Sequence, residues 1–236
     1  MRRFNQMRAR LFLPLLPVML LVSCETTQPD KSNHLSSYRG MEEQVGAFGN
    51  KALVKSGDPE RLKRYERVII EDVRVLLPKS TDPKVKKASR EEAEVLAEKF
   101  EDILEAEFGK FYEITRSRSS STMTIRAALT DLEPSNPALF AVNYMPYAGI
   151  AATGLQVLQG ETRALGAGSA SIEIEVLDSR SRRQLYAMVD RLEGGKLQPG
   201  SLSKYGQAEM AMQAWARKVR KAVQGKSTMT PVKKES

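Results

Sequence analysis

Four acidic residues lie within one short stretch of the chain, at Glu173, Glu175, Asp178 and Asp190. If they met near one end of a hairpin, their carboxylates could bind a cation or form an acid–base pair. Alternatively, Glu173 and Glu175 lie on a solvated strand face, while Asp178 starts a turn by accepting hydrogen bonds from backbone N–H groups. We favour the second interpretation, because acidic residues at strand spacing are common on solvated sheet faces.

The same stretch also carries basic residues, at Arg180, Arg182, Arg183 and Arg191. Their guanidinium groups could contact phosphate groups of lipid or lipopolysaccharide. The alternative is a solvated turn whose charges pair with nearby acids, and we favour it because surface charge clusters rarely need a ligand. Arg182 and Arg183 remain candidates for contact with a partner or ligand.

Residues 134–160 contain no charged side chain, although charged residues make up 28% of the whole sequence. Prolines, glycines and polar side chains in this stretch disfavour a membrane-spanning helix. We therefore expect residues 134–168 to form a long connection between two strands, most of whose apolar side chains fill the core. The candidates for contact with a partner or a membrane surface are Phe140, Tyr144, Met145 and Tyr147.

Residues that support histidine or cysteine chemistry are scarce, because the chain has one cysteine, Cys24, and one histidine, His34. A single cysteine excludes an internal disulfide, and a single histidine excludes a multi-histidine zinc site. The serines at 119–121 lack a neighbouring histidine base, and no glycine-rich phosphate loop is present. We therefore predict no catalytic residue, no metal and no dissociable cofactor.

The N-terminus has the order of a secretory signal: the basic run MRRFNQMRAR, the apolar run LFLPLLPVMLLV, and then Ser23-Cys24. This order resembles the signal of bacterial lipoproteins. The resemblance implies cleavage before Cys24, with a diacylglyceryl group on its thiol and an acyl chain on its new amine. Glu25 in the next position favours the periplasmic face of the outer membrane over the inner membrane, by analogy with enterobacterial sorting.

Periodic patterns predict one folded domain over residues 65–225. It should follow a signal peptide over 1–23 and a lipidated cysteine with a polar tether over 24–64, and precede a disordered tail over 226–236. Ser89 and Glu92 form a capping-box pattern, and apolar residues recur at helical spacing after it. The expected strands cover 65–78, 111–116, 122–129, 170–176 and 185–192, and the expected helices cover 89–108 and 202–223.

The order β-α-β-β-β-β-α predicts an α+β two-layer sandwich, with a mostly antiparallel sheet of about five strands and two helices on one face. The alternation of polar and apolar residues predicts that the other face is partly open to water. Apolar residues make up 41% of the sequence, which suits a soluble domain with a buried core. The net charge is +8, and it falls to +4 without the four arginines of the first ten residues, so we expect no nucleic-acid partner.

Three segments, TIRAALTDLEP, GSASIEIEVLDSRSRRQLYAMVDR and AWARKVRKAV, resemble the bacterial lipoprotein family called domain of unknown function 3313. In that family, a strand with a glutamate enters an aspartate-headed turn that usually contains a glycine, and the returning strand ends in another aspartate. The matching residues are Glu173 or Glu175, Asp178 and Asp190, with Arg182 or Arg183 at the place of the glycine. The resemblance implies a lipid-anchored envelope protein and implies no activity.

We therefore expect a non-catalytic envelope lipoprotein that binds an unidentified envelope protein or component. Two alternatives remain open at this level. One is a carboxylate- or metal-dependent envelope hydrolase that uses Asp178 and Asp190. The other is a carrier of lipid or another small ligand, which requires an apolar cavity.

Overall fold

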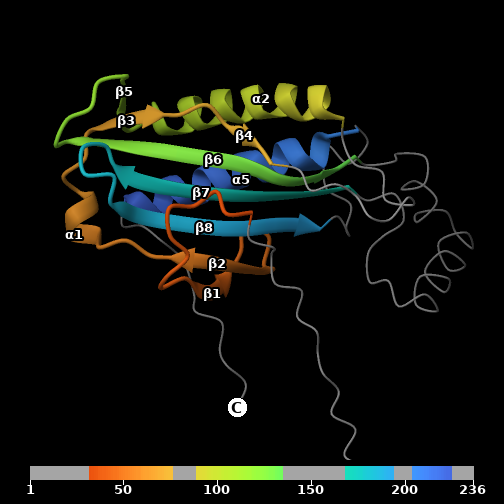
Figure 1. Cartoon of the computed structure of the whole chain (residues 1–236), viewed down its shortest axis with the longest axis horizontal. Coiled ribbons are helices and arrows are strands. Elements are labelled where there is room, and N and C mark those ends of the chain that lie inside the picture. Colours follow the sequence, from red (N-terminus) through yellow and green to blue (C-terminus); the bar gives the residue numbers. More distant parts are fainter. Residues whose placement is uncertain (1–31, 77–88, 135–167, 194–203, 225–236) are drawn as a thin grey trace, which may run out of the picture.

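A single mixed sheet forms the centre of the molecule (Figure 1). The computed structural model describes residues 32–76, 89–134, 168–193 and 204–224. Its elements are β1 (Glu42–Val45), β2 (Lys51–Lys55), α1 (Pro59–Leu62), β3 (Arg67–Ile70), β4 (Arg74–Val75), α2 (Arg90–Phe108), β5 (Glu113–Ile114), β6 (Thr122–Glu133), β7 (Ser169–Asp178), β8 (Gln184–Glu193) and α5 (Gly206–Val223). The strand order is β1-β2-β8-β7-β6-β3-β5, and β4 also pairs with β6.

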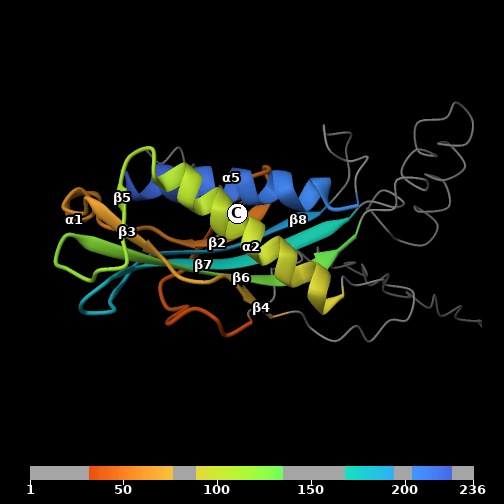
Figure 2. The ribbon, with the colours of Figure 1, turned by 90° about the horizontal axis from the view of Figure 1, so that it is seen from above.

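Helices α2 and α5 lie on one face of the sheet, and residues 32–41 lie on the other (Figure 2). The main hydrophobic core fills the space between the sheet and the two helices, where Trp215 of α5 and Phe100 of α2 are fully buried. Strand β7 contributes Ile172 and Ile174 to this core from alternate positions. The alternation of the sequence therefore determines which side chains of β7 face the helices.

Helix α2 begins at the capping box that the sequence predicts. The Ser89 side chain accepts a hydrogen bond from the Glu92 backbone N–H, and the Glu92 side chain accepts one from the Ser89 backbone N–H. These two bonds satisfy N–H groups that would otherwise lack a partner in the first turn. The helix ends at Gly109, so both predicted limits of this element are confirmed.

The α+β class and the two covering helices are confirmed, but the sheet has eight strands among the described residues rather than about five. It also contains parallel pairs, because β3 and β4 both run parallel to β6, and β5 runs parallel to β3. The expected strand over 65–78 is interrupted between Ile70 and Arg74. At this break the Val73 backbone N–H donates to Glu101 of α2, at 2.7 Å, instead of to a neighbouring strand.

Residues 32–64 belong to the folded domain, which corrects the expected tether over 24–64 in this part. Strands β1 and β2 form a hairpin that extends the sheet beyond β8, with Leu53 opposite Val189. Leu53 and Val189 join Leu35 in a second small hydrophobic cluster on the outer face of the sheet. The order from β3 to α5 follows the prediction, apart from the division of its first strand.

The prediction of a partly open sheet face is wrong for the centre of the sheet. Thr124 of β6 and Glu173 and Glu175 of β7 point away from the helices, yet all three side chains are buried. Residues 32–41 cover this face, as Figure 2 shows. The polar alternation of the strands therefore reflects a buried polar layer, not contact with water.

Candidate functional site

The buried carboxylates of Glu173 and Glu175 bind the chain segment that precedes β1. Glu173 accepts hydrogen bonds from the backbone N–H of Ser32 at 2.5 Å and of His34 at 3.0 Å. It also accepts one from the Tyr38 hydroxyl at 2.5 Å. Burial, and to a smaller extent this hydrogen bond, raises the pKa of Tyr38. We call residues 32–38, held in this way, the docked segment.

Glu175 joins the docked segment to the rest of the outer face. It accepts hydrogen bonds from the backbone N–H of Ser36 at 3.0 Å and from its hydroxyl at 2.6 Å. It also pairs with the Arg126 guanidinium, whose Nη1 lies 2.6 Å from Oε1 of Glu175. Arg126 also pairs with Glu71, with 3.2 Å between Nε and Oε2. Glu71 in turn pairs with Arg182, with 2.9 Å between Oε1 and Nη1. A chain of alternating charges thus connects the docked segment with the β7–β8 turn.

Asp178 starts the β7–β8 turn, as the second interpretation expects. Its Oδ1 accepts hydrogen bonds from the backbone N–H of Arg180 at 3.1 Å and of Ser181 at 2.7 Å, and Oδ2 accepts one from the Tyr65 hydroxyl. Burial opposes ionisation of Asp178, but these hydrogen bonds outweigh it and hold the pKa below its ordinary value. Arg182 has φ of 57°, the left-handed conformation that favours glycine. Of the two arginines, Arg182 is therefore the one whose backbone conformation would suit a glycine.

Asp190 lies on the opposite face of the sheet, under helix α5. Its carboxylate is fully buried and accepts hydrogen bonds from Nε1 of Trp215 at 3.0 Å, from the Ala47 backbone N–H at 2.8 Å and from Nδ2 of Asn50 at 2.7 Å. Burial raises the pKa of Asp190, and the hydrogen bonds oppose that rise. The carboxylate fastens α5 and the β1–β2 hairpin to β8.

The structure does not bring the four predicted carboxylates together. Glu173 and Glu175 share the outer face, Asp178 lies in the turn and Asp190 faces the helices. Within the described parts of the chain, no group of three or more histidine, cysteine, aspartate or glutamate side chains is arranged to hold a metal ion. The described carboxylates act as acceptors that join distant segments.

The loop that carries the serines at 119–121 is hydrogen-bonded to the β7–β8 turn, a contact that the sequence did not predict. Ser179 Oγ donates to the Ser119 carbonyl at 2.9 Å and accepts from the Ser119 backbone N–H at 3.2 Å. Arg67 donates to the Ser119 hydroxyl at 3.2 Å. These bonds hold the β5–β6 loop against the β7–β8 turn, and only the spatial proximity of the two loops reveals them.

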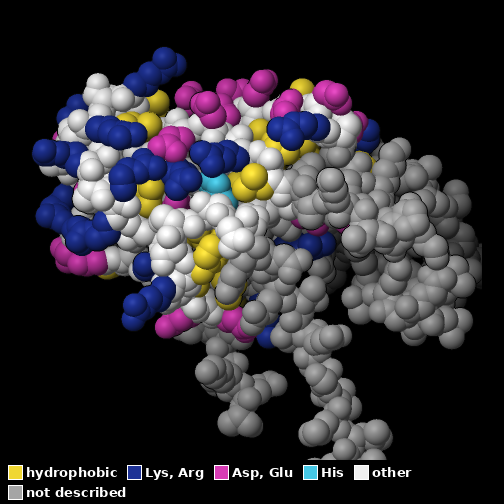
Figure 3. Space-filling view, viewed as in Figure 1, with side chains coloured by type: hydrophobic (Ala, Val, Ile, Leu, Met, Phe, Trp, Pro, Cys, Tyr) yellow, Lys and Arg dark blue, Asp and Glu magenta, His cyan; other side chains and the backbone are white. Residues whose placement is uncertain are grey.

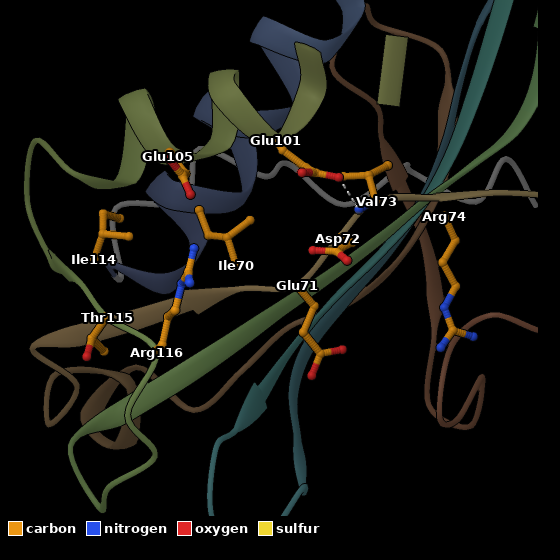
Figure 4. Close-up of a pocket in the computed structure, with 10 residues that line it drawn as sticks. All are labelled: Ile70, Glu71, Asp72, Val73, Arg74, Glu101, Glu105, Ile114, Thr115 and Arg116. Atoms are coloured by element: carbon orange, nitrogen blue, oxygen red, sulfur yellow. Dashed lines mark hydrogen bonds between the residues drawn. The ribbon is translucent and has the colours of Figure 1, made fainter. Parts of the chain in front are cut away.

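A groove of about 850 Å³ lies between α2 and the β3–β4 region (Figure 4). Its lining is largely charged, which differs from the apolar cavity that a lipid carrier requires. Glu101 accepts the bond from Val73 there, and burial raises the pKa of Glu101. The residues that line the groove are Ile70, Glu71, Asp72, Val73, Arg74, Glu101, Glu105, Ile114, Thr115 and Arg116.

His34 lies buried in the docked segment, and its two ring nitrogens have no hydrogen-bond partner among the described residues. Burial lowers the pKa of His34 from its ordinary 6.5, and the positive charges of Arg126 and Arg74 add to this effect. Glu175 and Glu173 oppose it. The folded protein therefore favours the neutral imidazole.

We expect the free energy of unfolding to fall as the pH drops below about 6.5, because the unfolded chain then binds a proton at His34 before the folded chain does. The neutral His34 contributes fully to stability above that pH. The contribution is lost as the pH falls from about 6.5 to the lower pKa of His34 in the folded protein, and it changes no further below that pKa. Urea unfolding at a series of pH values measures it, with His34→Leu as the comparison, since leucine cannot titrate. Equal pH slopes in the two proteins would contradict a role for His34.

The predicted lipidation site, Cys24, and four predicted contact residues, Phe140, Tyr144, Met145 and Tyr147, lie outside the described residues. The same holds for the uncharged stretch, of which only Pro134 is described. Within the described ranges, no helix has both the length and the apolar character needed to cross a membrane. Arg182 and Arg183 are described, and both lie in the β7–β8 turn.

The fold and contacts define an α+β domain in which buried carboxylates on the sheet bind the domain's own N-terminal segment. A family model matches residues 30–219, and the chain belongs to this family, which is described as "Protein of unknown function (DUF3313)". The family resemblance noted in the sequence is thus confirmed. No curated protein matches the chain.

Three solved structures are similar to the chain. A PelC dodecamer from Paraburkholderia phytofirmans is 11% identical, with 73% of this chain and 96% of that chain covered and a TM-score of 0.39. A DUF330 protein from Xanthomonas campestris is 11% identical, with coverage of 72% and 91% and a TM-score of 0.42. A DUF4136 protein from Bacteroides thetaiotaomicron is 9% identical, with coverage of 73% and 96% and a TM-score of 0.34.

Proposed function

We propose that the chain is a lipid-anchored lipoprotein of the bacterial envelope, whose domain binds another envelope component without catalysing a reaction. The observation that carries the proposal is the order of a basic run, an apolar run and then Cys24. In the proposed mature protein, Cys24 carries a diacylglyceryl group and an N-terminal acyl chain. Two or more acyl chains anchor a protein stably without a membrane-spanning helix.

The position of the docked segment supports this proposal. Eight peptide steps separate Cys24 from Ser32, whose backbone N–H binds Glu173. An extended chain of this length spans at most about 28 Å. The anchor would therefore hold the sheet close to the membrane surface, which in our proposal is the periplasmic face of the outer membrane.

The contacts of the carboxylates favour a binding role over the hydrolase alternative. Asp178 and Asp190, the residues that a hydrolase would use, lie in a turn and beneath α5, where each accepts several hydrogen bonds from the protein itself. A catalytic pair would need both carboxylates within reach of one substrate. The proposed mature protein instead uses its carboxylates to keep the domain attached to the segment that follows the anchor.

Substitution of the cysteine tests the anchor. Cys24→Ser should abolish labelling by radioactive fatty acid and leave an unprocessed precursor, because serine lacks the thiol that receives the lipid. Ser23→Gly is the matched control, since it keeps a small residue before the cysteine and should keep the label. Continued labelling of Cys24→Ser would overturn the proposal.

A further inference from the structure

Two loops that carry only basic charge meet at one end of the sheet. Residues 115–121 connect β5 to β6, and residues 179–183 connect β7 to β8. Together they contain many hydroxyl groups and no acidic residue. We call these two loops the arginine–serine tip, and its arginines are Arg116, Arg118, Arg180, Arg182 and Arg183.

Hydrogen bonds between its two loops give the arginine–serine tip a defined backbone arrangement. Ser179 bonds twice with the backbone of Ser119, and the Ser179 backbone N–H donates to the Thr122 carbonyl at 3.1 Å. Arg182 adopts the left-handed conformation and pairs with Glu71. The loops therefore present their arginines from a fixed backbone.

Most of the arginines in the tip remain available to a ligand. Arg116, Arg118, Arg180 and Arg183 are exposed, and their guanidinium groups pair with no carboxylate among the described residues. Figure 3 shows basic side chains gathered at the end of the face where Figure 1 places the two loops. Guanidinium and hydroxyl groups are the donors that bind phosphate oxygens.

Helix α2, along another edge of the domain, carries the opposite, negative charge (Figure 3). The outer surface of α2 is acidic and lies along the edge of the same view in Figure 3. A negatively charged surface would attract the tip and repel α2, so it would orient the domain. The exposed acids of α2 are Glu91, Glu94, Glu98, Asp102 and Glu105.

The docked segment runs along the outer face from the middle of β7 toward the tip, with Ser32 at Glu173 and Ser37 beside the β7–β8 turn. Nε2 of Gln184, the residue after Arg183, donates a hydrogen bond to the Ser37 carbonyl at 2.9 Å. The chain from Cys24 thus meets the sheet at Glu173, five positions along β7 from Asp178 at the turn, a distance of at most about 18 Å. The tip therefore lies within reach of the phosphate groups of the lipids around the proposed anchor.

We propose that the arginine–serine tip binds the phosphate groups of anionic lipids in the membrane that carries the anchor. Binding turns the tip toward the lipid surface and leaves the acidic helix α2 pointing away from it. The proposal rests on the proposed lipid anchor for its choice of surface. It assigns Arg118, Arg180 and Arg183 as the principal contacts, because all three are exposed and unpaired within the described chain and, unlike Arg116, do not line the groove beside α2.

Vesicle binding by a chain without acyl groups tests the tip separately from the anchor. The protein begins at residue 24 and carries Cys24→Ser, and co-sedimentation is measured with vesicles of phosphatidylcholine alone or mixed with phosphatidylglycerol. We expect binding to the mixed vesicles only, with release as salt rises above about 0.15 M. Equal binding to both vesicle types would overturn the proposal.

Matched triple variants locate the contact. Arg118→Ser, Arg180→Ser and Arg183→Ser together should lower the partition coefficient about a hundredfold, at about fivefold for each arginine. The control is the combination of Arg90→Ser, Arg217→Ser and Lys221→Ser, which removes the same charge from exposed positions on the helices and should change the coefficient less than about fivefold. Equal losses in the two variants would show that net charge alone binds the lipid and would overturn the assignment.

Two further measurements separate the outcomes. Trp215 fluorescence and thermal unfolding confirm that each variant is folded, since Trp215 is the only tryptophan and lies in the core. Lysine at the three tip positions should keep most of the binding, because a lipid surface responds chiefly to charge. Loss of fatty-acid labelling in cells concerns only the anchor, whereas loss of vesicle binding by the acyl-free chain concerns only the tip.

Discussion

Glu175→Ala is expected to lower the free energy of unfolding by about 3–5 kcal/mol, because it breaks a buried ion pair by removing one partner. The Arg126 guanidinium would keep only Glu71 among its partners in the described structure. The Ser36 backbone N–H and hydroxyl would also lose their acceptor, so the docked segment would loosen at Ser36 while Glu173 still holds its first part. Urea unfolding and hydrogen exchange at the Ser36 amide measure the two effects.

Two control variants separate the effect of the buried charge from that of losing any acidic side chain. Glu175→Gln keeps an acceptor oxygen but loses the charge, so it should cost less than alanine, about 1.5–3 kcal/mol. Glu94→Ala removes an ion pair with Arg90 on the exposed surface of α2 and should cost less than about 1 kcal/mol. If Glu175→Ala cost no more than Glu94→Ala, the docked segment would not depend on the buried carboxylate.

Asp190→Ala is expected to cost about 3 kcal/mol or more, because several buried donors lose one shared acceptor. The donors are Nε1 of Trp215, the Ala47 backbone N–H and Nδ2 of Asn50. Since the sequence has one tryptophan, the emission of Trp215 reports directly on this site. We expect Asp190→Ala to shift that emission and to lower the urea midpoint.

Asp190→Asn is the matched control, because it keeps the size of the side chain and one acceptor oxygen. It should lose less stability than alanine does, by about 1 kcal/mol for each hydrogen bond retained. A stable Asp190→Ala protein with unchanged Trp215 emission would show that the carboxylate does not fasten α5 to β8.

Local sequence patterns predicted the elements from β3 to α5 well. The capping box at Ser89, the alternation along β7 and the turn headed by Asp178 each depend on residues a few positions apart. Such interactions are visible in a sequence because propensity, capping and periodicity act over short separations. They were sufficient for the α+β class and for the family resemblance.

The role of the acidic residues was not predictable in the same way. Alternation placed Glu173 and Glu175 on the face away from the core, and that assignment of faces is correct. Alternation does not reveal what covers a face, and here residues 32–41 cover it. The Ser36 N–H that binds Glu175 lies 139 positions away in the chain, and its own segment is polar and irregular.

The sequence by itself determined the helices and strands of the central domain, the family and the candidate anchor cysteine, because each depends on neighbouring residues or on a recognisable order. Only the tertiary structure decided that the domain begins before β1 and that four nearby acids serve three separate structural roles. It also decided that arginines from two loops form one surface. The physical reason is that buried hydrogen bonds and charge clusters depend on contacts between distant segments, which no local pattern encodes.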